Sequence, residues 1–259
     1  MLFRSPKAEE AFDTGLEYHW IERYDAAEPF FREAVRLCEV HLDAWHHLAL
    51  ICDRTERSEE AFELWIHAFD LGRATLPDEF RIGQDVLEYE VVENRPFLRV
   101  THATGLAYMH RNEPWPASDV FEFLLAVCPG DNLVARRPLA ACYFDIDYPD
   151  GVLDLCEEYG PDYYPHLWYA RPLALFLQGK KKRARLALKR ALRRSPRIGR
   201  MLLEEYPEVP DEWHAGRYPL GSDAEAFEYW YQWGPYWDLT EGALDFLEET
   251  VAEFDREHA

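Results

Sequence analysis

The chain has 259 residues, of which 48% are hydrophobic and 15% aromatic, and this composition is ample for a packed core. Its formal net charge is −21. If this charge is spread evenly along the chain, it disfavours nucleic acids and anionic membranes as partners. No run reaches the roughly 18 apolar residues needed to cross a bilayer, and the first residues lack the apolar core of a secretion signal, so we expect a cytoplasmic protein without membrane insertion.

A sequence repeat with a period of 34 residues begins near the N-terminus. Gly15, Ala27, Phe31 and Ala34 return one period later as Ala49, Ala61, Trp65 and Ala68. This is the tetratricopeptide pattern, in which small residues let paired helices approach and large residues fill the space between them. Because each hairpin buries its apolar faces against the next, we expect an all-α, tetratricopeptide-like α-solenoid of stacked antiparallel helical hairpins with a C-terminal helical cap.

The expected single solenoid has four parts in chain order. Residues 8–74 hold two clear repeats, and residues 75–95 form an irregular connector. Within this connector, the sequence from Pro77 onward predicts a helix over residues 77–91. Residues 96–200 hold three further repeats, of which the middle one is degenerate because its small-residue signature is lost.

The last part, residues 201–259, reads as an aromatic loop and a capping hairpin. Gly234 and Pro235 are expected to end the first helix of this hairpin. The second helix is expected from about Thr240, with its strongly acidic face turned to solvent, as the outer face of a terminal cap should be.

Several short motifs follow one another in the C-terminal two thirds of the chain. They occupy residues 93–99, 195–198, 202–204, 221–229 and 241–244. In this order they resemble the tetratricopeptide part of the suppressor-of-tumorigenicity-seven family, over roughly residues 93–249. The resemblance implies a helical repeat fold, and it implies neither an enzymatic activity nor a cofactor.

The sequence contains none of the motifs that mark a catalytic or metal site. HExxH, HxH, GxSxG, GxGxxG and GxxxxGK[ST] are absent, and the five cysteines form no CxxC pair. Asp43 and His47 lie four residues apart, but a zinc or iron site needs three or four converging ligands. We therefore expect no catalytic residue, no metal, no cofactor and no enzyme. The alternative, an active site hidden among the 49 carboxylates, predicts a pocket with several perturbed ionisable groups.

The repeat register predicts a binding groove. Resemblance to tetratricopeptide proteins implies that positions two and five of the first helix of each repeat face a concave surface. In this chain the predicted groove residues are Asp43, His46, Arg99, His102, His166 and Tyr169. Such a groove suits a peptide or helix with acidic or aromatic side chains, and histidines that titrate near neutrality would make its binding pH-sensitive. The alternative is that these are ordinary, partly exposed helix residues.

A second predicted contact surface is basic. Residues 180–200 contain eleven basic residues and no acidic one. The face consists of Lys182, Arg185, Lys189, Arg190, Arg193, Arg194 and Arg197. It is either a solvated helix face or a footprint for nucleic acid, for anionic lipid, or for an acidic protein surface, including that of another copy. The sequence thus favours a non-enzymatic protein–protein interaction scaffold, with a nucleic-acid-associated adaptor as the alternative.

Overall fold

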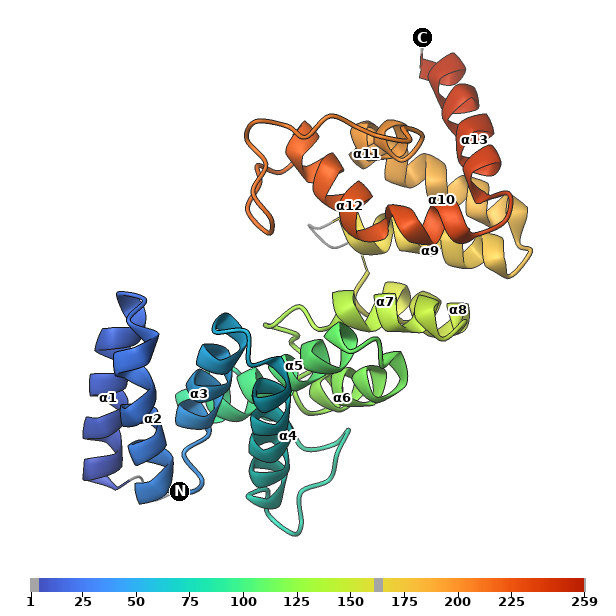
Figure 1. Ribbon diagram of the computed structural model, residues 1–259. Coiled ribbons are helices and arrows are strands. Elements are labelled where there is room, and N and C mark those ends of the chain that lie inside the picture. The colour runs from blue at the N-terminus through green and yellow to red at the C-terminus, as the bar shows by residue number, and fades with distance from the viewer. Residues whose placement is uncertain (1–4, 161–164, 259) are drawn as a thin grey trace. The chain divides into compact units, whose positions relative to one another are not determined.

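The computed structural model describes residues 5–160 and 165–258, and every regular element in these ranges is a helix (Figure 1). The predicted all-α class is therefore confirmed. The chain divides into two compact units, Met1–Leu139 (unit 1) and Ala140–Ala259 (unit 2). None of the described helices has the length and apolar character needed to span a membrane.

Unit 1 consists of three helical hairpins followed by the start of a fourth. Its elements are α1 (Pro6–Trp20), α2 (Tyr24–Leu37), α3 (Leu42–Arg54), α4 (Ser58–Ala74), the 3-10 helix η1 (Val92–Asn94), α5 (Arg95–His110), α6 (Pro114–Val127) and the first residues of α7 (Arg136–Asp145). Each odd-numbered helix from α1 to α5 packs most closely on the helix that follows it, and α2 on α3 and α4 on α5 join the hairpins into a stack.

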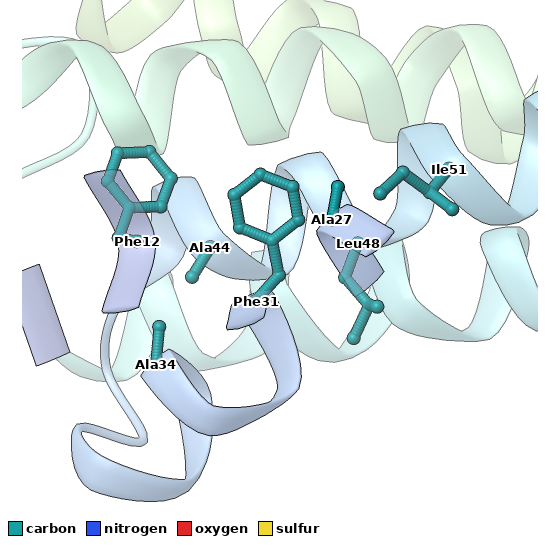
Figure 2. Close-up of a cluster of buried hydrophobic side chains, with 7 residues drawn as sticks. All are labelled: Phe12, Ala27, Phe31, Ala34, Ala44, Leu48 and Ile51. Atoms are coloured by element: carbon teal, nitrogen blue, oxygen red, sulfur yellow. The ribbon is translucent and has the colours of Figure 1, made fainter. Parts of the chain in front are cut away.

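The small residues of the repeat allow this close packing. A Cβ added to Gly15 would lie 2.7 Å from a ring carbon of Phe31, and one added to Gly105 would lie 2.6 Å from Phe121. Both rings are fully buried. Figure 2 shows Phe31 in a cluster with Phe12 of α1 and with small and aliphatic side chains of α2 and α3. The small-large pattern of the sequence therefore corresponds to glycine–ring contacts within each hairpin.

The connector after α4 differs from its predicted form. Residues 77–91 contain turns, bends and irregular backbone and no helix, so the prediction of a helix in this range is wrong. Gly83 has a positive φ of 79°, which breaks a helical run. Leu87 instead donates its backbone N–H to Val127 at the end of α6 and packs on the core between α4 and α5. Tertiary contacts thus replace the local hydrogen bonds that a helix would have supplied.

Unit 2 contains the rest of α7 and six more helices. They are α8 (Pro149–Glu158), α9 (Pro165–Leu177), α10 (Lys181–Arg194), α11 (Pro196–Met201), α12 (Asp223–Leu239) and α13 (Ala243–His258). Helix α9 packs on α8, α10 and α12, and α13 packs on α10 and α12. The two last helices therefore cover helices of the repeats.

One residue with a left-handed backbone recurs in the turn within each hairpin. Glu22, Glu56, Asn112, Asp147 and Gly179 all have φ between 54° and 70°. Asp147 belongs to the turn between α7 and α8, the pair in which the small-residue signature is lost. This pair thus shares the turn geometry of the other hairpins.

Helix α12 continues through the point at which the sequence predicted its end. Pro235 lies inside the helix, which runs to Leu239, so the expected termination at Gly234 and Pro235 is wrong. Proline in a helix interior removes one backbone hydrogen bond and is unfavourable by about 3 kcal/mol. Trp233 and Trp237, on either side of it, are both buried, and their burial offsets this cost.

Candidate functional site

The predicted groove residues of unit 1 lie on α3 and α5 and include an ion pair between these helices. Arg99 on α5 donates from its Nη2 to the carboxylate of Asp43 on α3. The Asp43 side chain is almost buried, whereas 40% of the Arg99 side chain is exposed. Because Asp43 is fixed inside, the guanidinium of Arg99 remains the accessible charge at this point.

His46 and His102, one turn further along the same two helices, are neutral. Trp65 of α4 donates its indole N–H to Nδ1 of His46 at 3.3 Å, which places the ring proton of His46 on Nε2. Burial, with a contribution from Arg99, lowers the pKa of His46 to about 4, and burial lowers the pKa of His102 to about 4. Both imidazoles are thus uncharged at pH 5.5 and at pH 8. The expected pH-sensitive binding near neutrality is therefore wrong for these two groups.

Two further histidines extend this surface. The rings of His19 on α1 and His47 on α3 lie 5.0 Å apart, and His47 stacks on Phe31 at 5.3 Å. Burial lowers the pKa of His19, and burial together with His46 lowers the pKa of His47 to about 3. We call Asp43, His46, Arg99 and His102, with His19 and His47, the helix-A surface.

The helix-A surface carries buried polar atoms that the protein leaves unsatisfied. Nδ1 of His19, Nδ1 of His47 and Nε of Arg99 are buried and have no hydrogen-bond partner among the described residues. Sequence reasoning did not assign His47 to the groove, because it sits one position after the register position of His46. No group of three or more potential metal ligands exists in the described part of the chain. These nitrogens are thus buried hydrogen-bonding groups that the described residues leave unpaired.

His166 and Tyr169 occupy the same register positions on α9, but they lie in the interior of unit 2. They are 1% and 0% exposed. The Tyr169 hydroxyl donates to the carbonyl of Ser195 at 2.6 Å and accepts from the N–H of Gly199. Tyr229 of α12 packs on both rings. Because α12 covers this face of α9, the two side chains serve the core of unit 2 and present no surface to a ligand.

The basic helix α10 uses one row of its side chains to hold α13. Arg185 pairs with Glu249 at 3.0 Å and with Glu253 at 3.2 Å. Lys189 lies between Glu253 and Glu257 at 2.7 and 2.6 Å and is only 13% exposed. The acidic face of the last helix, expected to be solvated, therefore neutralises two of the seven residues of the basic face within unit 2.

The remaining basic residues separate into three groups. Arg197 pairs with Asp223 at the start of α12 at 2.8 Å. Lys182 is exposed near the start of α10. Arg190, Arg193 and Arg194 line a cavity of about 440 Å³ between α9 and α10. The residues of the predicted basic face thus lie in four different environments.

Comparison with known proteins identifies the fold and a family. A family model described as "Transcriptional repressor TCF25" matches residues 27–218. It is not the suppressor-of-tumorigenicity-seven family, so that expectation is corrected; short motifs of helical hairpins do not distinguish one repeat family from another. A comparison with curated protein sequences finds no significant match.

Several solved structures are similar to the chain. MamA protein is 14% identical over 79% of this chain and 98% of its own, with a TM-score of 0.54. YrrB, described as a TPR protein with an unusual peptide-binding site, is 11% identical over 71% and 84%, with a TM-score of 0.50. The C-terminal part of a TPR repeat-containing protein from Cytophaga hutchinsonii is 10% identical over 95% and 80%, with a TM-score of 0.52. At these identities the likeness shows the fold alone, and it confirms the predicted tetratricopeptide-like class.

Proposed function

We propose, from the premise that this chain belongs to the TCF25 family of transcriptional repressors, that it is a non-enzymatic protein-interaction scaffold whose helix-A surface binds a peptide segment of another protein. The family description, a transcriptional repressor, supports a partner that takes part in the control of transcription, and with it a nuclear location beside the cytoplasmic one expected from the sequence. No catalytic step is part of the proposal.

The observation that carries the proposal is the set of unsatisfied nitrogens on the helix-A surface. A buried polar atom without a partner is unfavourable by about 1–3 kcal/mol, so three of them on α1, α3 and α5 mark a place where a partner gains hydrogen bonds. The unpaired nitrogen of each neutral imidazole accepts or donates one hydrogen bond, according to the tautomer, and Arg99 adds a charge. A segment with backbone amides and a carboxylate, lying across the three helices, matches these groups.

The non-enzymatic part rests on the kind of groups that the fold brings together. The helix-A surface combines one satisfied ion pair with neutral, ring-packed histidines. The cavity of unit 2 is lined by arginines and apolar residues, and no carboxylate is among its described lining residues. Neither place pairs a nucleophile or a general base with an acid, which is the arrangement that hydrolytic and proton-transfer chemistry requires.

The experiment begins with selection of binding peptides from a random-peptide display library on the full chain. The affinity of a selected peptide is then measured for the wild type and for Arg99→Gln and His47→Phe. Loss of the Arg99 charge or of the His47 nitrogen is expected to weaken binding by about tenfold or more, because each leaves a ligand group unpaired. Affinity is expected to be equal at pH 5.5 and pH 8, since the pKa values of His46 and His102 are about 4.

Arg36→Gln provides the matched control. Arg36 is an exposed arginine on α2, the second helix of its hairpin, and among the described residues it pairs only with Glu33 on the same helix. This variant is expected to bind within about twofold of the wild type, as is usual for an exposed ion pair. Peptides that bind all three variants as tightly as the wild type would refute the helix-A surface as the binding site.

The alternative function, a nucleic-acid-associated adaptor that uses the basic face, is supported by the family's role in transcription. It is weakened by the pairing of Arg185, Lys189 and Arg197 with carboxylates of their own unit. Such an adaptor would lose its partner after nuclease treatment or after a tenfold rise in salt. Peptide binding on the helix-A surface is expected to survive both treatments.

A further inference from the structure

The cavity between α9 and α10 combines an apolar part with a cationic part, and it lies wholly in unit 2. The apolar lining comes from Cys156, Leu167, Ala187 and Ala191. The cationic lining comes from Arg171, Arg190, Arg193 and Arg194. A volume of about 440 Å³ falls in the range of known ligand pockets, which is roughly 300–1,000 Å³. We call this the arginine cavity.

The arginines of the cavity lack carboxylate partners. Arg190, Arg193 and Arg194 make no ion pair with any described residue, and Arg171 has only Glu157 at 3.8 Å. On the opposite row of α10, by contrast, Arg185 and Lys189 have two carboxylates each. The helix therefore directs one part of its charge to α13 and leaves the other part unneutralised at the cavity, where like charges three and four residues apart repel.

The position of these arginines at the end of α10 explains only part of their placement. Basic residues in the last helical turn interact favourably with the helix dipole. This interaction explains why Arg193 and Arg194 occur in the last turn of α10, whether or not a cavity is present. It does not account for the cavity or for Trp168, which also lines it. The guanidinium of Arg194 lies 4.7 Å from the Trp168 ring, and the buried indole N–H has no partner among the described residues.

We propose that the arginine cavity binds a short acidic segment of a partner protein, in addition to the segment on the helix-A surface. Carboxylates of the segment would pair with Arg190, Arg193 and Arg194, and an adjoining apolar side chain would pack on Leu167 and Ala191. A carboxylate or carbonyl oxygen would also satisfy the Trp168 indole. The site needs no part of unit 1, so it stands or falls independently of the proposed helix-A surface.

The surroundings favour an acidic peptide over a nucleic acid. Unit 2 contains 23 acidic and 14 basic residues, a net charge of −9. An extended polyanion that reached the cavity would meet this negative field, including the acidic row of α13, whereas a peptide with two or three carboxylates needs only the local arginines. The apolar lining also matches a side chain of the Leu or Phe type better than it matches a phosphate backbone.

The test measures fluorescence anisotropy with the full chain and three labelled probes. These are a peptide of about eight alternating glutamate and leucine residues, the same peptide with glutamine for glutamate, and a uridine RNA of about ten nucleotides. The acidic peptide is expected to bind about tenfold or more tightly than its glutamine counterpart and than the RNA. Failure of the acidic peptide to bind, or tighter binding of the RNA, would overturn the proposal.

Two double variants on α10 separate the cavity from the general charge of the helix. Arg190→Gln with Arg193→Gln removes two charges at the cavity, and Lys182→Gln with Arg183→Gln removes two exposed charges away from it. The first double variant is expected to bind the acidic peptide about tenfold or more weakly than the wild type, and the second about twofold or less weakly. Equal losses would assign binding to the charge of α10 as a whole and refute the cavity.

A third variant keeps the charge and narrows the cavity. Ala187 is 9% exposed and lines the cavity beside the arginines, so Ala187→Met places a larger side chain in the space proposed for the apolar residue. Peptide affinity is expected to fall by about fivefold or more while circular dichroism remains that of the wild type. A correctly folded Ala187→Met chain with unchanged affinity would contradict the proposed binding mode.

Discussion

At the scale of single residues, burial determines the chemistry of unit 1. His46, His47 and His102 have pKa values of about 4, 3 and 4, because their rings are largely removed from water and lie near Arg99 or one another. They are neutral hydrogen-bonding groups at physiological pH. Arg99 is therefore the charged group through which the helix-A surface can attract a carboxylate, and the histidines determine the geometry around it.

These pKa values predict how stability depends on pH. The unfolded histidines take up protons below about pH 6.5, whereas the folded ones do so only near pH 3–4. The free energy of unfolding is therefore expected to be unaffected by these groups above pH 6.5. It should fall as the pH drops from 6.5 toward 4, by about 1 kcal/mol per pH unit for each histidine. Urea unfolding at pH 7, 6 and 5 measures this slope.

His102→Gln is expected to reduce the pH dependence of the free energy of unfolding by about 1 kcal/mol per pH unit, the contribution of one histidine, because glutamine does not titrate. His110→Gln, at the exposed end of the same helix, serves as the matched control and is expected to keep the wild-type slope. If the slope of His102→Gln equals that of the wild type, the folded chain does not hold His102 in its neutral form.

Gly105 shows how a single small residue sets the distance between two helices. A Cβ at this position would lie 2.6 Å from two ring carbons of Phe121, which is fully buried. Gly105→Ala is expected to lower the free energy of unfolding by about 1–3 kcal/mol through overpacking. In the double variant with Phe121→Leu, which removes those ring carbons, the two losses are expected to be less than additive. Strict additivity in urea unfolding would contradict the contact.

At the scale of elements, the helices after the repeats decide which repeat surfaces remain open. Helix α12 covers α9 through Tyr229 and Trp233, which pack on His166. Helix α13 covers one row of α10 through its glutamates. The turn in each hairpin, with its left-handed residue, is conserved in geometry even where the small residues are lost. The terminal helices α12 and α13 thus determine which faces of the repeat helices α9 and α10 are accessible to a partner.

The ion pairs between α10 and α13 predict a position-dependent effect of charge reversal. Lys189→Glu would oppose Glu253 and Glu257, and it is expected to lower the midpoint of thermal unfolding; adding Glu253→Lys should restore part of the loss. Lys182→Glu, on the same helix, changes an exposed residue that makes no ion pair with the described part of α13, and it is expected to have a smaller effect. The difference between the two single variants should shrink in about 1 M salt, where charges are screened within roughly 3 Å.

An equal response of Lys189→Glu and Lys182→Glu in both salt conditions would contradict the pairing of α10 with α13. Reversal of Arg185 or Lys189 perturbs the contact with α13, so variants of Arg190 and Arg193 are the suitable probes of partner binding.

At the scale of the whole molecule, negative charge is a property of both units. Unit 1 has 26 acidic and 14 basic residues, and unit 2 stays negative despite the eleven basic residues of 180–200. This charge favours solubility and disfavours extended polyanions as partners. The family match covers residues from both units. A scaffold with one hydrogen-bonding surface in unit 1 and one cationic cavity in unit 2 suits partners that offer acidic segments.

The sequence by itself determined the repeat and its core. The 34-residue period placed Gly15, Phe31, Gly105 and Phe121 correctly in helix–helix contacts. The reason is that a small and a large residue at fixed spacing pack on each other within one hairpin. The period also assigned Asp43 and Arg99 to the same register position of successive hairpins, and these residues of α3 and α5 form an ion pair. Both results depend on contacts within one repeat or between successive repeats.

Only the tertiary structure decided which of the predicted surface residues can meet a partner. His166 and Tyr169 have the register of groove residues, yet α12 buries them, and Arg185 and Lys189 belong to a basic run, yet α13 neutralises them. Helices α12 and α13 carry no repeat signature, so no periodicity could show where they pack. Whether a side chain such as Arg185 can meet a partner depends on residues 60 or more positions away in the chain. The spacing of residues within a repeat does not reveal such distant contacts.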